Sequence, residues 1–428
     1  MKIKIIKTKD QLDNKELDIA FDVSGKTLDY SSYCLTERGK ELWQGALSNR
    51  AGPIKKELME LDSLARENGY PGIRVLCEAT GVYHRRLLKV AKQLGYKTAL
   101  ISGEAVSKSQ VIQSNDYNKN DVKDPKTMLV VSEVGKPLVD RNLSGGWLVM
   151  RQLNLEYERN QKDGTRIKNR LQQGLFELFP DLGFKNDWLY NSRASTVVSE
   201  LYGFNPYKII EEGRSSVTQK LKRRKLRKDT ISRLWDYAVK STETLQDKDI
   251  TDCLEEELRD LHTHLQDLLS RRMQLRFRMV AEVEKLHKRG AVLTDPHATP
   301  IGPFMFARVI AETGALSDFG YIEQLWRYGG LNLVCKESGV FKGQIKLSKK
   351  GRARLRRCLQ QASLKLVVKG GLYGDYFHDK KNNGKCGNKS MVAVSRKLLK
   401  LLFGLEKSGG VYDAKRVFQD RVKMEEAA

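Results

Sequence analysis

The chain has 428 residues, 40% of them apolar and 30% charged, which is enough for two or three folded domains. Lysine and arginine number 77 against 53 aspartate and glutamate residues, so the formal net charge is +24. That surplus favours a polyanionic partner, because side chains that neutralise phosphates release counterions; a generic basic protein or a membrane-surface binder is the alternative. No apolar run approaches the ~20 residues that cross a bilayer, and the six scattered cysteines, with no C-x-x-C pair, argue against a zinc module or a disulfide framework. We therefore expect a cytoplasmic protein with no membrane partner that works on nucleic acid.

The first third of the chain has the pattern of an α/β domain. Alternating or continuous apolar runs separated by short turns predict strands, and longer amphipathic runs predict helices. The expected order is an RNase H-like one, although a sugar-kinase or actin-type ATPase domain can begin in the same way. The elements are strands at 17–23, 28–35 and 41–47, a helix near 53–67, a strand at 73–77, a helix at about 83–94 and a strand at 97–101.

Four carboxylates stand out in this basic chain. Asp22 lies in an apolar run, Glu78 ends a second one, and Asp121 and Asp124 stand three apart in NKNDVKDPKTMLVV. Metal-dependent phosphoryl transfer uses carboxylates around two cations about 4 Å apart, and Mg²⁺ prefers hard oxygen ligands. The four acids therefore predict a site for Mg²⁺, with two ions, in a nuclease or transposase.

Each of these acids also has a plainer interpretation. Asp22 could be an ordinary strand-end acid, and Glu78 could form a local ion pair with Arg85 or Arg86. Asp124 precedes a proline, which suits the first helical position, so Asp124 could be a helix N-cap.

The middle third is expected to be helical. Apolar residues spaced four and three apart predict a coiled-coil seam, with a helix at 147–179 as its partner and Pro180 ending that helix. Such a seam either packs within the chain or joins two copies of it. Its residues are Leu254, Leu258, Leu261, Leu265 and Leu268, continued by Leu275, Met279, Val283 and Leu286.

Basic stretches provide candidate nucleic-acid contacts, although such a run is usually a solvated face. KLKRRKLRK at 220–228 has seven basic residues in nine, and seven more lie between Lys346 and Arg357. The turn TPIGP at 299–303 lies between predicted helices and would let backbone N–H groups approach a phosphate. The candidates are Lys222, Arg223, Arg224, Lys225, Gly302, Lys342, Lys349, Lys350, Arg352, Arg354, Arg356 and Arg357.

Ser338 lies in KESGVFKG, where lysines surround a hydroxyl group. A serine that attacks phosphorus needs access, activation and nearby positive charge. From the residues alone, a Ser-Gly pair in a basic loop is more often a turn or a contact to the phosphate backbone. The segment after Gly370 is expected to be a loop followed by one amphipathic helix.

FDVSGKTLDY, the EATGVYHRRL block and the NDVKD block resemble the DEDD-class transposases of bacterial insertion sequences, which include the Piv-type DNA invertases. The stretch from PIGPFMFARVIAETG to GRARLRR is similar to that family's second domain. The resemblance implies a RuvC-like, RNase H-like α/β domain at 1–145, a helical coiled-coil region at 146–290, and a mainly α C-terminal transposase domain at 291–428. It also implies a helix-hairpin-helix-like element in that last domain.

The resemblance assigns roles to particular residues. Asp22, Glu78, Asp121 and Asp124 would be the metal ligands, and Ser338 would be the nucleophile that forms a covalent link to DNA. The chain departs from the family in having Phe21 where a glycine is usual, one serine rather than a pair, and a long middle region.

The resemblance also implies partners. They are double-stranded DNA of the element ends and the target, a structured noncoding bridge RNA that guides recombination, and further copies of the chain in a dimer or tetramer. The acids of one subunit would then meet the serine of another, in the nucleoid of a bacterial or archaeal cell.

Three other functions stay open from the sequence. One is a metal-dependent nuclease of the Holliday-junction type that uses water as its nucleophile. The others are a nucleic-acid-binding protein without catalysis and an actin-like ATPase.

Overall fold

A computed structural model describes residues 15–36, 39–78, 81–114, 123–134, 138–139, 143–182, 192–243, 248–334, 337–338, 341–342 and 346–418. The chain divides into two compact units, the first ending at Asn142 and the second beginning at Leu143. No helix in these ranges is long and apolar enough to cross a membrane.

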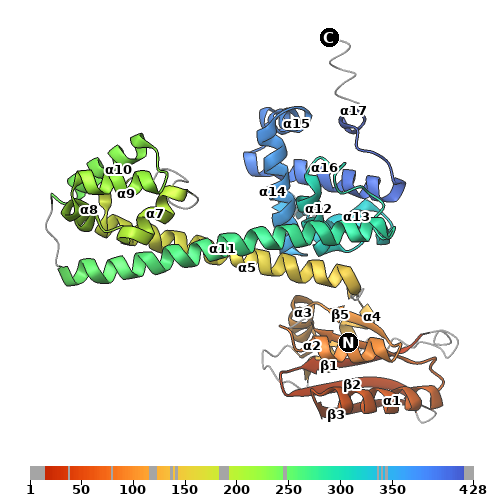
Figure 1. Cartoon of the computed structure of the whole chain (residues 1–428). Coiled ribbons are helices and arrows are strands. Elements are labelled where there is room, and N and C mark those ends of the chain that lie inside the picture. Colours follow the sequence, from red (N-terminus) through yellow and green to blue (C-terminus); the bar gives the residue numbers. More distant parts are fainter. Residues whose placement is uncertain are drawn as a thin grey trace. The chain divides into compact units, whose positions relative to one another are not determined.

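The first unit is built on a mixed sheet with the strand order β3-β2-β1-β4-β5-β6 (Figure 1). β1 is antiparallel to β2 and parallel to β4, and β4 is parallel to β5. The elements expected from the sequence are all present. Their bounds are β1 Leu17–Val23, β2 Thr27–Thr36, β3 Gly39–Ser48, α1 Ala51–Glu67, β4 Ile73–Glu78, α2 His84–Gln93, β5 Lys97–Ile101, α3 Gly103–Ser114, α4 Lys123–Val134 and β6 Leu138–Val139.

Alternation along the strands sends successive side chains to opposite faces of this sheet. The odd-numbered residues of β1, from Leu17 to Val23, are buried in one cluster with apolar residues of α1 and α2. Ala20 of β1 and Leu76 of β4 belong to a second cluster with residues of α3 and α4. Asp22 and Glu78, at even positions, therefore lie on the face that α3 and α4 cover.

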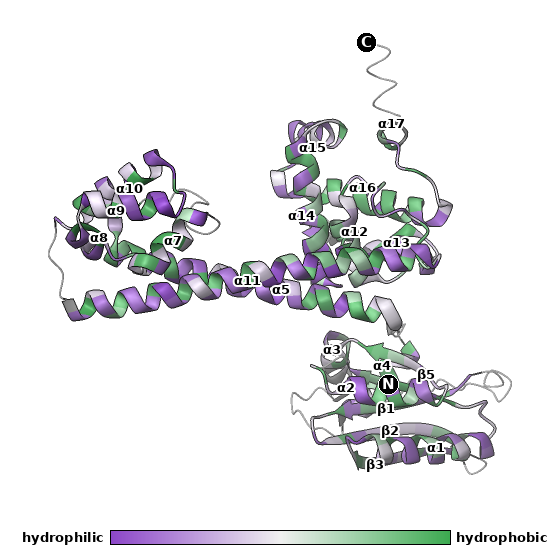
Figure 2. Cartoon of the chain, in the orientation of Figure 1, coloured by the Kyte–Doolittle hydropathy of each residue, from purple (hydrophilic) through white to green (hydrophobic). Residues whose placement is uncertain are grey.

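The second unit is organised along two long helices, α5 (Gly145–Leu178) and α11 (Lys248–Lys288). The seam residues Leu258, Leu261 and Leu265 are buried in one cluster with the C-terminal half of α5, while Leu275 to Leu286 share another cluster with its N-terminal half. The helices are therefore antiparallel, and apolar and hydrophilic residues interleave along both (Figure 2). The predicted partner helix is correct, and Pro180 begins the short 3-10 turn that follows α5.

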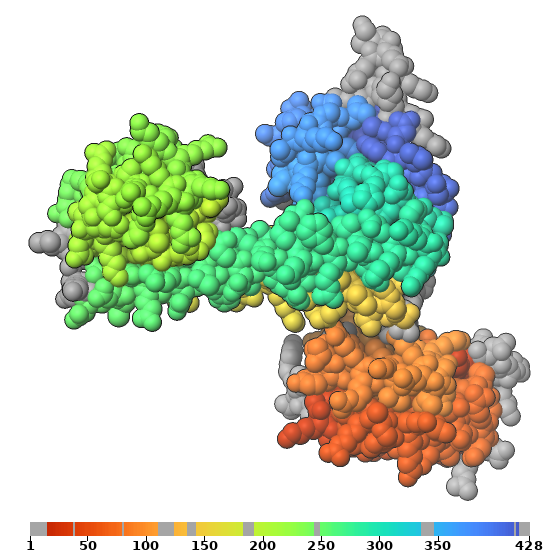
Figure 3. Space-filling view, in the orientation of Figure 1, coloured from red at the N-terminus to blue at the C-terminus, as the bar shows by residue number. Residues whose placement is uncertain are grey.

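Two groups of short helices occupy the two ends of this pair (Figures 1 and 3). The first group packs with Leu258 and its neighbours, and the second packs with Leu275 and its neighbours. The first comprises α7 Arg193–Tyr202, α8 Pro206–Glu212, α9 Arg214–Arg223 and α10 Lys228–Ser241. The second comprises α12 Gly302–Thr313, α13 Ile322–Gly329, α14 Ala353–Lys369, α15 Leu372–Asn382, α16 Gly387–Ser408 and α17 Ala414–Val417.

The expectation of a loop after Gly370 is wrong. Residues 372–382 form helix α15, whose Tyr373 is buried among apolar residues of the second group. The glycines of GGLYGDYFHDKKNNGK suggest turns, which is why a loop was expected. Gly370 and Gly371 are both at positive φ, and they form only the break between α14 and α15.

The described residues between α13 and α14 include four short strands. β7 (Leu333–Val334) pairs antiparallel with β10 (Lys346–Leu347), and β8 (Glu337–Ser338) pairs antiparallel with β9 (Phe341–Lys342). We call the four strands β7 to β10 the serine hairpin, because Ser338 is the last residue of β8.

Candidate active site and nucleic-acid interface

Asp22 and Glu78 lie at the carboxyl ends of two neighbouring parallel strands. The register of β1 and β4 runs from Leu17 opposite Ile73 to Phe21 opposite Cys77, so Asp22 and Glu78 come next on each strand. Adjacent strands lie about 4.8 Å apart. Because both residues have the same parity as Ala20 and Leu76, the two carboxylates share one face of the sheet.

A third acid lies in the same row. Asp22 of β1 is the register partner of Asp29 of β2, so their side chains are cross-strand neighbours on one face. Two like charges in such a position repel each other unless a proton or a cation lies near them. Asp29 was not among the residues singled out from the sequence. It lies seven residues after Asp22, on the other side of the short turn between β1 and β2, and this spacing is the signal that could have identified it.

The Glu78 carboxylate packs directly against the backbone of Gly103, the first residue of α3. A methyl group added at Gly103 would overlap the Glu78 carboxyl group, whose carbon would lie 2.8 Å from the new carbon. The absence of a side chain at Gly103 is therefore what lets Glu78 occupy its position.

Helix α4 lies on the same face and carries Asp124. Ser132 of α4 donates a 2.7 Å hydrogen bond to Asp18 Oδ2, and Met128 is buried in the cluster that contains Ala20. Asp124, Met128 and Ser132 are four residues apart and so lie along one side of the helix. From Ser132 back to Asp124 is about 12 Å along a helix, and from Asp18 to Asp22 is about 13 Å along a strand, so α4 directs Asp124 toward the Asp22 end of β1.

Asp18 itself is already neutralised. Arg74 on β4 donates from Nε and Nη2 to the two Asp18 oxygens, each at 2.6 Å. The hydrogen bond to Asp18 raises the pKa of Arg74, and Asp18 also anchors α4 through Ser132. Asp18 is thus a structural acid in the same sheet, four residues before the candidate catalytic Asp22.

Asp124 is buried and is the second residue of α4 rather than the residue before the helix. That position does not match the N-cap interpretation. Arg86, one of the proposed ion-pair partners of Glu78, donates to the backbone carbonyl of Asn49. Asp121 lies outside the described residues.

These donors have the chemistry that suits a hard divalent cation. Asp22, Glu78 and Asp124 offer carboxylate oxygens, and Gly103 leaves room for one of the carboxylates in its cradle. Within the described ranges, however, no group of three or more His, Cys, Asp or Glu side chains is arranged to hold a metal ion. Asp22, Glu78 and Asp124 are therefore candidate ligands, and their role in metal binding stays a prediction.

The base of the serine hairpin is held by a close contact between two glycine backbones. Gly330, at the end of α13, has φ +64°, and Gly351, just before α14, has φ +147°. A Cβ on Gly351 would lie 2.5 Å from the Gly330 nitrogen and 2.5 Å from the Tyr328 oxygen. Ser348 N–H donates to Asn332 O at 2.8 Å, and Lys349 N–H donates to Gly330 O at 3.2 Å. The two ends of the hairpin are therefore fixed to each other.

The C-terminal basic residues fall into two groups. Lys349, Lys350 and Arg354 are exposed, as a nucleic-acid contact requires. Arg352 donates to Glu312 Oε2 from Nε at 2.9 Å and from Nη2 at 2.8 Å.

Two further arginines of this segment also make internal contacts. Arg356 Nη1 donates to Gly329 O at 2.9 Å, and Arg357 forms a 3.1 Å ion pair with Glu158. A count of basic residues could not separate the internal arginines from the exposed ones. Of the Lys342 side chain the structure describes nothing.

The basic run at 220–228 spans the end of α9, a turn and the start of α10. Lys222, Arg223, Arg224 and Lys225 are all exposed, and Arg224 lies 3.4 Å from Glu200. Lys225 has φ +62°, a left-handed conformation in which glycine is the usual residue after a helix. Lys225 N–H donates to Lys222 O at 2.8 Å, which closes the helix end.

Gly302 begins α12 at the turn predicted to approach a phosphate. Its φ of +72° is a conformation that favours glycine, and its N–H donates to Thr299 O at 3.2 Å. The turn therefore lies between two helices, α11 and α12, as expected. Its role as a helix-hairpin-helix element stays a prediction.

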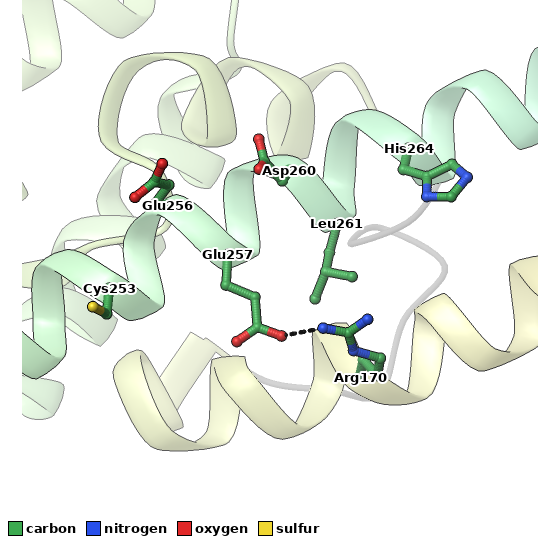
Figure 4. A pocket seen from close by; sticks show the side chains of 7 residues that line it. All are labelled: Arg170, Cys253, Glu256, Glu257, Asp260, Leu261 and His264. Atoms are coloured by element: carbon green, nitrogen blue, oxygen red, sulfur yellow. Dashed lines mark hydrogen bonds and ion pairs between the residues drawn. The ribbon is translucent and has the colours of Figure 1, made fainter.

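Figure 4 shows an open hollow between α5 and α11 that carries a different set of groups. Glu257 is paired with Arg170 at 2.6 Å across it. Three acidic side chains in its lining would repel a phosphate backbone, and we assign this hollow no role in nucleic-acid binding. The lining residues are Arg170, Cys253, Glu256, Glu257, Asp260, Leu261 and His264.

Two protein-family models match the chain. A transposase model of the IS110 DEDD type matches residues 19–180. A second model, described as the transposase IS116/IS110/IS902 family, matches residues 298–377. The two matches together cover more than half of the chain, and the DEDD domain implies an RNase H-like fold, in agreement with the mixed sheet.

No curated protein sequence matches the chain significantly. The first family match contains all four candidate acids, and the second contains Ser338. The chain carries both domains of a DNA-processing enzyme and belongs to the IS110-type DEDD transposases.

Proposed function

We propose that this transposase cleaves and rejoins DNA strands through a covalent link between DNA and Ser338, with Asp22, Glu78, Asp121 and Asp124 as the ligands of Mg²⁺. The observation that carries the proposal is the placement of Asp22 and Glu78 side by side at parallel strand ends, in a chain that also has Ser338 next to the tip of a two-stranded hairpin. The first arrangement suits phosphate chemistry, and the second suits a nucleophile that must reach a DNA backbone.

In the proposed reaction each phosphodiester bond that breaks is replaced by another phosphate ester bond, so no bond is lost to water. Ser338 Oγ attacks phosphorus and loses its proton, the bond from phosphorus to one sugar oxygen breaks, and that oxygen takes up a proton. The hydroxyl end of another strand then attacks the serine ester, and the Ser338 hydroxyl is regenerated. The expected product is thus a rejoined strand, whereas attack by water would leave a cut one.

The chain's own groups would assist at three points. Lys349, Lys350 and Arg354, exposed near the hairpin base, would hold the DNA backbone. The acids would orient the phosphate through the bound ion, and Gly103 would keep Glu78 in place. Mg²⁺, when bound, supplies positive charge against the charge that develops on the phosphate oxygens.

The acids and the serine belong to different units of the chain. A complete site therefore requires the two units to meet, either from one chain or from two subunits of a synaptic dimer or tetramer. Mixing an Asp22→Asn chain with a Ser338→Ala chain tests this point, since activity of the mixture, with neither chain active alone, indicates a site shared between subunits.

The guide of the reaction is proposed to be a structured noncoding RNA. The exposed basic residues Lys222 to Lys225 support this proposal, because backbone contacts of this kind bind any duplex and leave sequence recognition to base pairing. RNA that copurifies with the protein and maps beside its own coding region is the expected finding. Target recognition that persists after complete removal of RNA would contradict it.

The central test is detection of DNA that stays attached to protein after denaturation. The wild-type chain and a Ser348→Ala control, altered just after the serine hairpin, are expected to form the attached species, while Ser338→Ala forms none and still binds DNA. A fully active Ser338→Ala variant, or cut ends with no attached DNA, would favour the junction nuclease that uses water.

Metal dependence is tested separately by thermal unfolding. Mg²⁺ is expected to raise the melting temperature of the wild-type chain and to have a smaller effect on Asp22→Asn. A wild-type chain that shows no response to Mg²⁺ or Mn²⁺ would contradict the assigned role of the four acids.

A further inference from the structure

A group of buried charged and polar side chains links three helices of the second unit. Arg308 on α12 is 2% exposed, Glu312 on the same helix is 0% exposed, and Asn154 and Glu158 on α5 are 0% and 4% exposed. Arg352, in the residue position before α14, completes the set, and its side chain is 30% exposed. We call these five residues the buried polar network.

The network is continuous from α5 to α14. Arg308 donates to Glu158 and, at 3.0 Å, to Asn154 Oδ1. Asn154 Nδ2 donates to Glu312 Oε1 at 2.9 Å, and Arg352 donates twice to Glu312 Oε2. Each member therefore contacts the next without a break.

The network is also satisfied. In the described part of the chain, none of the buried side-chain oxygen or nitrogen atoms of these residues lacks a hydrogen-bond partner. Burial opposes the charge on Arg352, but the Glu312 carboxylate beside it raises the pKa of the guanidinium overall. Arg352 therefore keeps its positive charge beside Glu312.

A buried ion network is a weak source of stability, since apolar residues of the same volume often do as well. It does impose geometry, because a charge with fixed partners tolerates only one arrangement of the groups around it. The informative question is therefore which part of the molecule this network holds in place.

The network ends at the base of the serine hairpin. Arg352 N–H donates to Tyr328 O at 2.9 Å, next to the Gly330 and Gly351 contact. Arg151 of α5 donates to Glu312 O at 2.9 Å and approaches Tyr328 Oη at 3.4 Å. The same backbone that carries the hairpin is therefore tied to α5 and α12.

We propose that Glu312 and Arg352 are positioning residues for Ser338, which hold the hairpin in the orientation that the nucleophile needs. The inference rests on the proposed function of Ser338. It also reassigns Arg352, which the basic pattern predicted as a nucleic-acid contact, from binding DNA to aligning the group that attacks it.

Arg354 provides a matched control. It lies two residues from Arg352 and is exposed. Replacing each with glutamine removes one positive charge from the same segment. Arg354→Gln is expected to weaken DNA binding and to lower the slope of log affinity against log salt by about 1. Arg352→Gln is expected to leave that slope unchanged.

The decisive readout separates binding from reaction. At saturating DNA, and well below the melting temperature of each variant, Arg352→Gln is expected to form the attached DNA–protein species about tenfold or more slowly than the wild type. Ser348→Ala, a change just after β10 at a residue with no assigned role, is expected to form it at the wild-type rate. Two results would overturn the positioning role of Arg352. One is that the Arg352→Gln chain, at saturating DNA, forms the attached species at the wild-type rate. The other is that its slope of log affinity against log salt falls as that of Arg354→Gln does.

A second variant covers the case in which Arg352→Gln unfolds. Replacing both Glu312 and Arg352 with glutamine removes the unpaired buried charge and keeps two groups that can hydrogen-bond. The double variant is expected to fold and to react slowly, while a double variant that folds and reacts at the wild-type rate would contradict the inference.

The wild-type measurement distinguishes the two proposals. If the wild-type chain forms no Ser338-dependent attached species, the proposed function fails. If it forms that species and the Arg352→Gln chain does so equally fast, only the positioning role fails.

Discussion

Gly103 gives a sharp test of the acidic site, because the change is small and its physical effect is specific. Alanine at this position places a methyl group against the Glu78 carboxylate. The carboxyl carbon would have to retreat from 2.8 Å to the 3.4 Å or more of an ordinary contact. Gly103 has no positive φ, so the backbone itself accepts alanine.

The expected magnitude follows from that displacement. A misplacement of about 1 Å in a reacting constellation can lower the rate by about 100-fold. We therefore expect Gly103→Ala to slow strand cleavage by about 10- to 100-fold, which raises the activation barrier by about 1.4 to 2.8 kcal/mol. The free energy of unfolding should rise, since Gly→Ala at a compatible helical site stabilises the folded chain by about 0.4 to 1 kcal/mol.

The assay compares single-turnover cleavage and thermal unfolding in the wild type and four variants. Gly52→Ala is the matched control, because it lies in α1 of the same unit with nothing within 4 Å of the added carbon. Glu78→Asp shortens the carboxylate arm, so the double variant Gly103→Ala, Glu78→Asp relieves the overlap. We expect it to be more active than the product of the two single effects predicts.

Two results would refute this reasoning. The first is a Gly103→Ala chain that cleaves at the wild-type rate, since Glu78 would then not depend on the cradle. The second is a loss of activity accompanied by an equal loss of stability, which would indicate general damage to α3.

Two further predictions concern the second unit. Burial lowers the pKa of His262 from 6.5 to about 4. Between these two pH values the unfolded chain binds more protons than the folded chain, so the free energy of unfolding falls as the pH falls. The loss is about 2 kcal/mol at pH 5. His262→Gln should flatten this dependence of thermal unfolding on pH, whereas the same change at the exposed His264 should not. An unchanged slope in His262→Gln would contradict the lowered pKa of His262. Lys225→Gly should raise the free energy of unfolding by about 1 kcal/mol, because it relieves a left-handed lysine. The same change should lower the salt slope of nucleic-acid binding by about 1, and a variant that is stabilised but keeps its full slope would argue against contact at the α9 end.

Much of the first unit was predictable because its physics is local. Alternation in LDIAFDV sends Leu17 and Ile19 to one face and Ala20 to the other, and the apolar run marks a strand that is covered on both faces. The positions of Asp22 and Glu78 in their apolar runs placed them near strand ends, and their parity places both on one face. Asp29 was missed because its importance depends on the pairing register, which links residues across a turn.

Contacts between distant residues explain the other misses. Nothing near Arg352 in the chain indicates that Glu312, forty residues earlier, will neutralise it. Gly103 could not be recognised either, since only the folded sheet brings it against Glu78. The seam on α11 was predictable from its spacing, while the supercoiling of the helix pair stays a prediction.

The antiparallel pair of α5 and α11 also sets the distance between the two apolar clusters of the second unit, and this distance can change only in steps. Leu261 belongs to the apolar cluster at one end and Val283 to the cluster at the other, about 33 Å apart along the helix. One inserted residue would rotate everything beyond it by about 100° and turn an apolar face to water. Only matched insertions near seven residues in both helices keep the faces aligned, each lengthening the pair by about 10 Å. We therefore expect relatives of this chain to differ in the length of the helix pair by such increments, so that the pair fixes the distance between its two groups of helices.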